Sequence, residues 1–320
     1  MIVSVIGSAR QNRSKAATRR PLALDKHWTL RKSAGLQILE AAPLKAFDWL
    51  VHGFSTRPGG ASKLGTSRPS RARNEKVLNL GFTDWDRRES VEANRRRFVD
   101  ALGGKRFELV TLRQIHSDVV HAIGRAPSGV CKGDALATRA PDLLLGVQTA
   151  DCIPILLADP RNRAVAAVHA GWRGTLARIA AKTIGRMQME FGTRPADIVA
   201  ALGPGIGRCC YEIGPEVVKE FAAQFSRARE WFEGPFDALA SGEDPNPLPW
   251  LTMMPPGHEP PPPRCHLDLH AANSAILAAA GVSPINIFAV NLCTSCRTDL
   301  FFSYRREGET GRMMAVIGIK

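Results

Sequence analysis

Three short segments place a reactive side chain directly beside a run of apolar residues. His116 lies between two predicted strands, Cys152 comes just before an apolar run over residues 153–157, and His169 follows one over residues 164–168. Mixed α/β proteins place their functional residues in the loops at strand ends. Two imidazoles and one thiolate suit zinc and leave a fourth position for water or substrate. Zinc held in this way lowers the pKa of bound water to about 7, which would provide a nucleophile at neutral pH.

Each of these residues also has a simpler interpretation. A single histidine at a strand end is more often a structural residue, and a buried cysteine is more often inert packing. Asp134 could act as a base or orient a ligand histidine, but it could equally cap a turn. The residue types alone therefore leave a catalytic zinc centre of His116, Cys152 and His169, with Asp134 beside it, as a hypothesis.

Two arginines are candidates for binding an anion. Arg173 lies in the segment GWRG (171–174) at the predicted start of a helix, where the helix N-terminus attracts negative charge. Arg57 precedes a Pro-Gly-Gly turn. For either arginine a surface salt bridge is the competing interpretation. The turn GPGIG (203–207) could also cradle an anion with its backbone N–H groups, but it lacks the lysine of a P-loop.

The remaining cysteines offer a different metal site. Cys293 and Cys296 form a C-x-x-C pair, which could hold a structural zinc ion. Additional ligands for it would be Cys265, His266 and His270. The adjacent pair Cys209 and Cys210 is interpreted as small residues that fill a tight turn.

The order of the predicted elements determines where these side chains lie. The hydrophobic pattern predicts strands over residues 108–114, 119–123, 143–148, 153–157, 164–168, 198–202, 285–290 and 313–319. Apolar residues at helical spacing predict helices over residues 90–102, 174–191, 216–225 and 267–280. Strands and helices alternate without a repeated βαβ period. We therefore expect an α/β fold, a single compact domain built as a layered mixed-sheet sandwich with flanking helices.

The domain boundaries follow from composition. Residues 1–40 are predicted to form a basic, disordered N-terminal extension, and residues 41–320 the catalytic domain. Within that domain, residues 52–79 are predicted to form a loop because proline and glycine punctuate them. Residues 234–264 contain ten prolines and no hydrophobic period, which predicts a Pro-rich surface loop or lid.

Charge and cysteine content restrict the function classes. About half of the net charge of +13 lies in the first 35 residues, so the charge of the remainder is ordinary for an enzyme. This distribution does not favour a nucleic-acid partner, and binding of nucleic acid by the basic extension stays an alternative. No apolar run approaches the roughly 20 residues that span a bilayer. Seven cysteines, an odd number, without a secretory signal favour a cytoplasmic protein whose cysteines are free or metal-bound.

Taken together, the motifs resemble one known family. In order along the chain they are HGFSTR (52–57), NLG (79–81), QIHS (114–117), DAL (134–136), TADCIP (149–154), HAGWRG (169–174), GPGIG (203–207), CCYE (209–212), CT (293–294) and FFSYRR (301–306). This series resembles the YfiH-like family, also described as laccase-domain, polyphenol oxidase or FAMIN-like proteins. The resemblance covers about residues 45–320.

The resemblance implies a zinc site made by His116, Cys152 and His169. It also implies phosphorolysis of adenosine, inosine, guanosine or methylthioadenosine, together with hydrolytic deamination of adenosine. The partners would then be purine nucleosides and phosphate, with no membrane, in a monomer or a homodimer. The candidate residues for binding substrate or phosphate are Arg57, Arg173, Gln148 and Tyr211.

The residues also test the other activities described for such proteins. A multicopper oxidase needs about ten histidine ligands, mostly in His-x-His pairs, whereas this chain has eight histidines and no such pair. A single copper ion in place of zinc stays possible, as in a single-copper polyphenol oxidase. The usual zinc deaminase signature, H-x-E with P-C-x-x-C, is also absent. A further alternative is a hydrolase of cell-wall precursors, a peptidoglycan-editing enzyme with Cys152 as its nucleophile.

Overall fold

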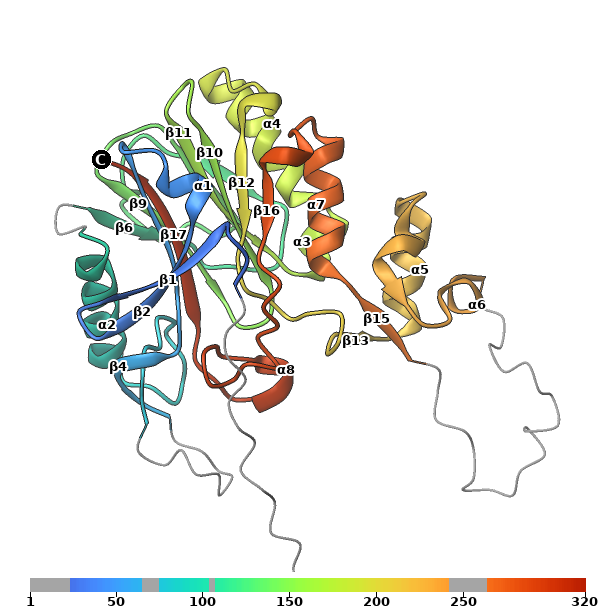
Figure 1. The fold of residues 1–320 in the computed structure, drawn as a ribbon, viewed down its shortest axis with the longest axis horizontal. Helices are drawn as coiled ribbons and strands as arrows, with labels where there is room; N and C mark the ends of the chain where they lie inside the picture. The colour runs from blue at the N-terminus through green and yellow to red at the C-terminus, as the bar shows by residue number, and fades with distance from the viewer. Residues whose placement is uncertain (1–23, 65–74, 104–106, 242–263) are drawn as a thin grey trace, which may run out of the picture.

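Two six-stranded sheets pack face to face in the computed structural model, which describes residues 24–64, 75–103, 107–241 and 264–320 (Figure 1). The first sheet has the strand order β1 (Trp28–Ser33), β2 (Leu36–Ala41), β3 (Leu50–Ser55), β17 (Met313–Ile319), β9 (Leu143–Thr149) and β6 (Glu108–Thr111). The second has the order β16 (Ile287–Ala289), β12 (Val199–Leu202), β10 (Ile153–Asp159), β11 (Ala164–Ala170), β8 (Ala135–Thr138) and β7 (Val120–Ala122).

The central strands are buried on both faces, and their side chains alternate between two cores. In β10, Leu156 points into the core between the two sheets, whereas Ile155 and Leu157 point into the core under the helices. In β17, Ala315 faces the second sheet and Val316 faces the opposite side. This burial on both sides explains why the central strands are continuous apolar runs in the sequence.

Helices cover the outer face of each sheet (Figure 1). On the first sheet lies α2 (Arg88–Ala101), whose Phe98 packs into a core with residues of β2, β9 and β17. On the second sheet lie α4 (Ile179–Phe191) and α7 (Leu269–Ala279). The layers are therefore helix, sheet, sheet and helix. This confirms the predicted α/β sandwich with flanking helices.

Smaller elements complete the fold. Beside the second sheet, β13 (Glu212–Ile213), β15 (Cys265–Leu267) and β14 (Phe232–Glu233) form a short sheet with α5 (Pro215–Gln224) and α6 (Phe236–Ser241) next to it (Figure 1). The remaining elements are α1 (Ala42–Lys45), the pair β4 (Pro58–Lys63) and β5 (Lys76–Val77), α3 (Trp172–Leu176) and α8 (Tyr304–Glu307).

Three sequence predictions differ from the structure. The helix predicted over residues 174–191 is two helices, α3 and α4, because Arg178 has a left-handed backbone with φ of 59°. Its guanidinium donates to the Gln224 carbonyl at 3.0 Å and stacks on Phe225, which holds the break in place. The loop predicted over residues 52–79 contains most of β3, together with β4 and β5. Within β3, a Cβ on Gly53 would lie 2.8 Å from Ile38, so the glycine permits close packing within the sheet.

The predicted N-terminal extension is shorter than residues 1–40. Residues 28–41 form β1 and β2, which pair antiparallel around a turn in which Ala34 and Gly35 both have positive φ. The basic side chains of this segment concealed its buried apolar residues, such as Leu36 and Ile38. Residues 1–23 and 242–263, on which the rest of the extension and most of the Pro-rich loop fall, lie outside the described residues. Among the residues that are described, no helix has the length and apolar character needed to cross a membrane.

Candidate metal centre and active-site cavity

Strand pairing in the second sheet brings the predicted metal ligands to one end. Strands β10 and β11 are antiparallel, with Pro154 opposite His169. Cys152 comes two residues before Pro154, so its thiol and the His169 imidazole lie at the same end of this pair. Strand β8 flanks β11 on the other side, and there the His169 N–H donates to the Asp134 carbonyl at 2.8 Å. Strand β7 runs parallel to β8, so the loop before it carries His116 to the same place.

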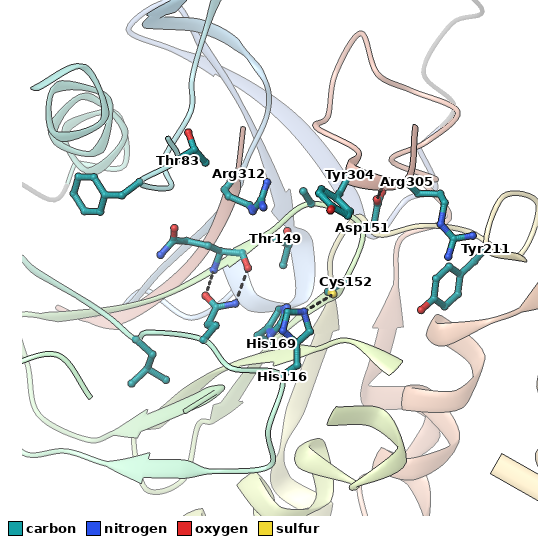
Figure 2. Close-up of a pocket in the computed structure, with 15 residues that line it drawn as sticks. Thr83, His116, Thr149, Asp151, Cys152, His169, Tyr211, Tyr304, Arg305 and Arg312 are labelled. Atoms are coloured by element: carbon teal, nitrogen blue, oxygen red, sulfur yellow. Dashed lines mark hydrogen bonds between the residues drawn. The ribbon is translucent and has the colours of Figure 1, made fainter. Parts of the chain in front are cut away.

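The three side chains converge closely enough to share one ion. Their ligand atoms all lie within 4.8 Å of one another. The distance from Cys152 Sγ to His116 Nε2 is 3.9 Å, and the rings of His116 and His169 lie 4.9 Å apart between centroids at 79°. Zinc bonds of about 2.0–2.3 Å in a tetrahedral arrangement place ligand atoms roughly 3.3–3.8 Å apart. The trio therefore fits a single zinc ion, with the two imidazoles directed toward the sulfur (Figure 2).

Asp134 holds two of these ligands in position. Its buried carboxylate accepts hydrogen bonds from the backbone N–H of His116 at 3.0 Å and of Ser117 at 2.6 Å, and from the Ser117 hydroxyl at 2.7 Å. It also accepts the Nδ1–H of His169 at 2.9 Å. Because a carboxylate only accepts hydrogen bonds, His169 carries a proton on Nδ1, so Nε2 is the nitrogen through which it would bind a metal.

The backbone beside the ligands is held in an uncommon conformation. His116 has φ of 57° and Asp151 has φ of 95°, in the region that non-glycine residues rarely adopt. The Asp134 carboxylate fixes the His116 loop. Asp151 is fixed through its carbonyl, which accepts from the Ile206 N–H at 2.7 Å, and through its carboxylate, which accepts from the Thr294 hydroxyl at 2.6 Å. Such strain gathers at functional sites, where the surrounding structure imposes it.

The charges of the site favour a thiolate. Burial alone would raise the pKa of Cys152, but the charge of His169 and the hydrogen bond with His116 outweigh burial and lower it. Burial likewise opposes a charged His169, but the Cys152 thiolate and the Asp134 carboxylate raise its pKa overall. Burial also opposes charge on Asp134, yet the hydrogen bonds from His169 and Ser117 keep its pKa far below the usual range. The lowered pKa therefore favours the thiolate form of Cys152, which is the form in which cysteine binds metals.

Gly171 lies against the ligands, and only a residue without a side chain fits there. A Cβ at this position would lie 2.9 Å from Cys152 Sγ and 3.2 Å from a ring carbon of His116. Its own φ of −80° would permit any residue, so the restriction comes from the ligand side chains. The donor set, the fixed His169 tautomer and this close packing all fit a bound zinc ion.

The trio opens onto a cavity of about 620 Å³. The other residues that line it include Phe82, Thr83, Leu112, Gln114, Gln148, Thr149, Asp151, Tyr211, Tyr304, Arg305 and Arg312. The first sheet contributes part of this wall because Met313, at the start of β17, pairs with Thr149, at the end of β9. Arg312 comes immediately before Met313 and is thereby placed at the cavity. The site thus lies where the ends of both sheets meet.

Two arginines give the cavity its positive charge. The Arg305 guanidinium lies 5.1 Å from the Tyr211 ring centroid, and that of Arg312 lies 5.9 Å from the Tyr304 ring centroid. Both donate to backbone carbonyls, and within the described part of the chain neither forms an ion pair with a carboxylate. In Figure 2 Arg312, Tyr304 and Arg305 lie across from the metal ligands. An anion placed between the arginines and the metal site would therefore meet unpaired cations.

The sequence-predicted binding residues divide into two groups. Gln148 and Tyr211 line the cavity. Arg57 does not, because its buried guanidinium forms an ion pair with Glu307 at 2.6 Å and donates to the Thr298 carbonyl at 3.0 Å. Arg173 is exposed, stacks on Trp172 and lies outside the cavity wall. The arginines that line the cavity are instead Arg305 and Arg312.

The two arginines that sequence reasoning missed carried only weak signals. Arg305 belongs to the FFSYRR motif, and Arg312 comes just before a predicted strand, the same kind of position that identified Cys152. A search for charged residues at strand ends would have found Arg312. Nothing in the local sequence of Arg305 distinguishes it from its neighbour Arg306.

The cysteines outside the trio are arranged differently from the predicted structural site. Cys265 is buried in the core of the second sheet, and His270 Nε2 donates to the Gly203 carbonyl at 2.9 Å. Neither therefore serves the C-x-x-C pair. Cys293 and Cys296 instead meet Cys209 and Cys210.

Known proteins resemble this chain in sequence and in fold. The profile of the family described as "Multi-copper polyphenol oxidoreductase laccase" matches residues 51–320. The chain is 38% identical over 291 residues to the "Purine nucleoside phosphorylase" of Deinococcus radiodurans, which covers 89% of this chain and 94% of that protein. It is 37% identical over 220 residues to "Adenosine deaminase RL5" of an unknown prokaryotic organism, which covers 65% of this chain and 73% of that protein. The crystal structure of the Bacillus licheniformis hypothetical protein YfiH matches with a TM-score of 0.72 at 30% identity, covering 91% of this chain and 99% of that one.

The profile match, these relatives and the shared fold confirm the resemblance that the ordered motifs indicated. The copper count implied by the family's description does not follow from this chain, because it has eight histidines in total and the trio uses two of them. The chain belongs to the family described as multi-copper polyphenol oxidoreductase laccases, the YfiH-like or laccase-domain proteins.

Proposed function

We propose that this protein is a zinc-dependent purine nucleoside phosphorylase that also deaminates adenosine. The observation that carries the proposal is the convergence of His116, Cys152 and His169 on a cavity that also presents Arg305 and Arg312. Relatives named purine nucleoside phosphorylase and adenosine deaminase support it. The substrates would be adenosine, inosine, guanosine or methylthioadenosine, together with phosphate.

The metal would be held by His116, Cys152 and His169, and Asp134 would orient the two histidine ligands. When bound, a zinc ion supplies a Lewis acid and a water of lowered pKa, which is the chemistry that hydrolytic deamination requires. The tautomer of His169 and the position of the His116 loop both depend on the Asp134 carboxylate. Asp134 thus positions the ligands, and its role as a general base is the weaker of the two proposed, because its lowered pKa makes it a poor proton acceptor.

Phosphorolysis requires phosphate beside C1′ of the ribose. Arg305 and Arg312 can hold it because guanidinium groups bind phosphate with two parallel hydrogen bonds. Arg312 is half-buried, so pairing with a phosphate would compensate the desolvation that lowers its pKa. Tyr211 and Tyr304 offer aromatic faces on which a purine base could stack, whereas the guanidinium groups of Arg88 and Arg95 already lie over the Phe82 ring.

The decisive experiment is to incubate purified, zinc-loaded protein with adenosine, with and without phosphate, and to separate the products by chromatography. Adenine that forms only with phosphate shows phosphorolysis, and inosine in either case shows deamination. His116→Ala should abolish both products. Absence of turnover by the wild-type protein, or equal turnover by His116→Ala, would refute the proposal.

One observation favours a second function, hydrolysis by a cysteine nucleophile. Without a metal, Cys152, His169 and Asp134 form the chain of nucleophile, base and orienting carboxylate that cysteine hydrolases use. Metal content separates the two. Loss of one zinc ion per chain in Cys152→Ala relative to the wild type supports the phosphorylase, whereas a zinc content that Cys152→Ala leaves unchanged, together with alkylation of Cys152 by iodoacetamide in the wild type, supports the hydrolase. Copper in this site instead of zinc would appear in the same elemental analysis.

We also propose that the protein works in the cytoplasm. All seven cysteines are free thiols, and two groups of them lie within bonding reach of a metal. Such thiols are maintained in a reducing compartment.

A further inference from the structure

A second group of potential metal ligands lies outside the cavity. Cys209 and Cys210 lie in the turn between β12 and β13, and Cys293 and Cys296 lie in the loop after β16. The four sulfur atoms all lie within 4.8 Å of one another. Cys296 Sγ is 3.6 Å from Cys209 Sγ and 3.4 Å from Cys210 Sγ.

We propose that these four cysteines bind a structural zinc ion, separate from the one in the cavity. Four sulfurs at zinc bond lengths of about 2.3 Å form a tetrahedron whose edges are roughly 3.8 Å. The observed distances of 3.4 and 3.6 Å are close to that edge and far from the roughly 2.05 Å of a disulfide. A soft, four-thiolate donor set selects zinc over harder cations such as magnesium.

The backbone prepares this site before any metal is bound. The two segments are joined by a bridge between Gly205 and Cys293, in which the Thr294 N–H donates to the Gly205 carbonyl at 2.9 Å. The Gly207 N–H points at Cys293 Sγ from 3.2 Å, the kind of bond that supports a metal-bound thiolate. Because Cys209 and Cys296 are exposed, an ion can reach the sulfurs from solvent.

The position of this cluster suggests what a zinc ion would do there. Tyr211 of the cavity wall directly follows Cys210, and Thr294 directly follows Cys293. Thr294 holds the Asp151 carboxylate, which also accepts the backbone N–H of Arg305 at 2.7 Å. The zinc ion would therefore link the two loops and fix the position of the cavity wall that carries Tyr211 and Arg305. It would act on the shape of the cavity and not on the reacting atoms.

Metal content tests this inference independently of catalysis. Four proteins are purified under reducing conditions: the wild type, Cys152→Ala, the double variant Cys209→Ser with Cys296→Ser, and Cys131→Ser. The zinc content per chain of each is measured by inductively coupled plasma mass spectrometry. We expect two zinc ions in the wild type and in Cys131→Ser, which alters a cysteine outside both groups. We expect one ion in Cys152→Ala and one in the double variant. If the double variant keeps as much zinc as the wild type, the inference is wrong, even if the cavity ion is present.

Two further measurements cover a double variant that fails to fold. Cobalt titrated into metal-free Cys152→Ala protein should give, at one equivalent, the intense near-ultraviolet charge-transfer band of several thiolates, since the cavity site has lost its only thiolate. Absence of that band, or a Cys210–Cys296 disulfide in non-reduced peptide maps of freshly purified wild type, would overturn the inference. In wild-type protein, removal of the zinc should also increase amide hydrogen exchange over residues 203–212 and 291–306, where the ion would join the two loops.

Discussion

Replacing Asp134 with asparagine should weaken metal binding without removing any metal ligand. One carboxylate oxygen accepts from the His116 N–H at 3.0 Å and from His169 Nδ1 at 2.9 Å. The other accepts from the Ser117 N–H at 2.6 Å, the Ser117 hydroxyl at 2.7 Å and the Ile115 N–H at 3.2 Å. Asparagine has one accepting oxygen, so it can satisfy only one of these two sets.

The less costly orientation keeps the oxygen toward Ser117 and Ile115 and turns the NH₂ group toward the two histidines. The part-buried His116 N–H then loses its partner, which costs about 1 kcal/mol of unfolding free energy. His169 must move its proton from Nδ1 to Nε2 to accept from the new NH₂, which removes the lone pair that would bind zinc. Loss of such an orienting partner lowers metal affinity by about 10–100-fold, which corresponds to roughly 1.4–2.8 kcal/mol.

Competition with a chromogenic chelator measures the zinc affinity of Asp134→Asn, and thermal unfolding of the metal-free protein measures its stability. Asp118→Asn provides the matched control, because Asp118 makes an exposed pair with Lys182 and does not contact the trio. That control should bind zinc like the wild type. A folded Asp134→Asn protein with wild-type zinc affinity would show that the carboxylate does not set the tautomer, and the reasoning would fail.

Three other substitutions separate the metal site, the phosphate site and the stability of the fold. Gly171→Ala should displace Cys152 Sγ and lower zinc affinity in the same chelator assay, whereas Gly185→Ala, where a Cβ meets nothing within 4 Å, should leave it unchanged. Arg305→Met should raise the KM for phosphate about tenfold or more in the phosphorolysis assay. Arg57→Met should instead lower the free energy of unfolding by about 1–3 kcal/mol, because it removes the charged hydrogen-bond partner of the part-buried Glu307 carboxylate. Burial lowers the pKa of His52 in the folded protein to about 4, whereas a histidine in the unfolded chain has a pKa of about 6.5. As the pH falls between these two values, the unfolded state binds a proton that the folded state does not bind. The free energy of unfolding should then fall by about 3 kcal/mol between pH 6.5 and pH 4, and urea titrations of His52→Gln should show a flatter pH dependence.

The sequence predicted the central strands well, and it singled out the three side chains that the structure brings together, because both signals are local. Strands β9, β10 and β11 are apolar on both faces, so their runs are visible without knowledge of their neighbours. Cys152 and His169 stand out because each interrupts the polarity pattern at the end of such a run. Once the runs are recognised as strands, antiparallel pairing alone puts the two side chains at one end.

The errors concern features that depend on distant partners. Arg57 has the local sequence of an exposed turn residue, but it forms an ion pair with Glu307 of α8. The loop predicted over residues 52–79 includes Gly53, and only the packing of Ile38 against it shows why a strand has a glycine there. Cys209 and Cys210 do lie in a turn, but the turn alone does not show which other cysteines approach them. Their partners, Cys293 and Cys296, are more than eighty positions away in the chain.

The place of β17 in the first sheet has a consequence for how the chain reaches its native state. This strand follows every other strand in the sequence, yet it lies in the middle of the sheet between β3 and β9. During synthesis, the edges of β3 and β9 that pair with β17 therefore have no partner until residues 313–319 leave the ribosome. Open edges of apolar strands invite pairing with other chains, and contacts between distant segments form slowly. The sheet end that supports Arg312 and Thr149 is thus completed only after the last strand has been synthesised.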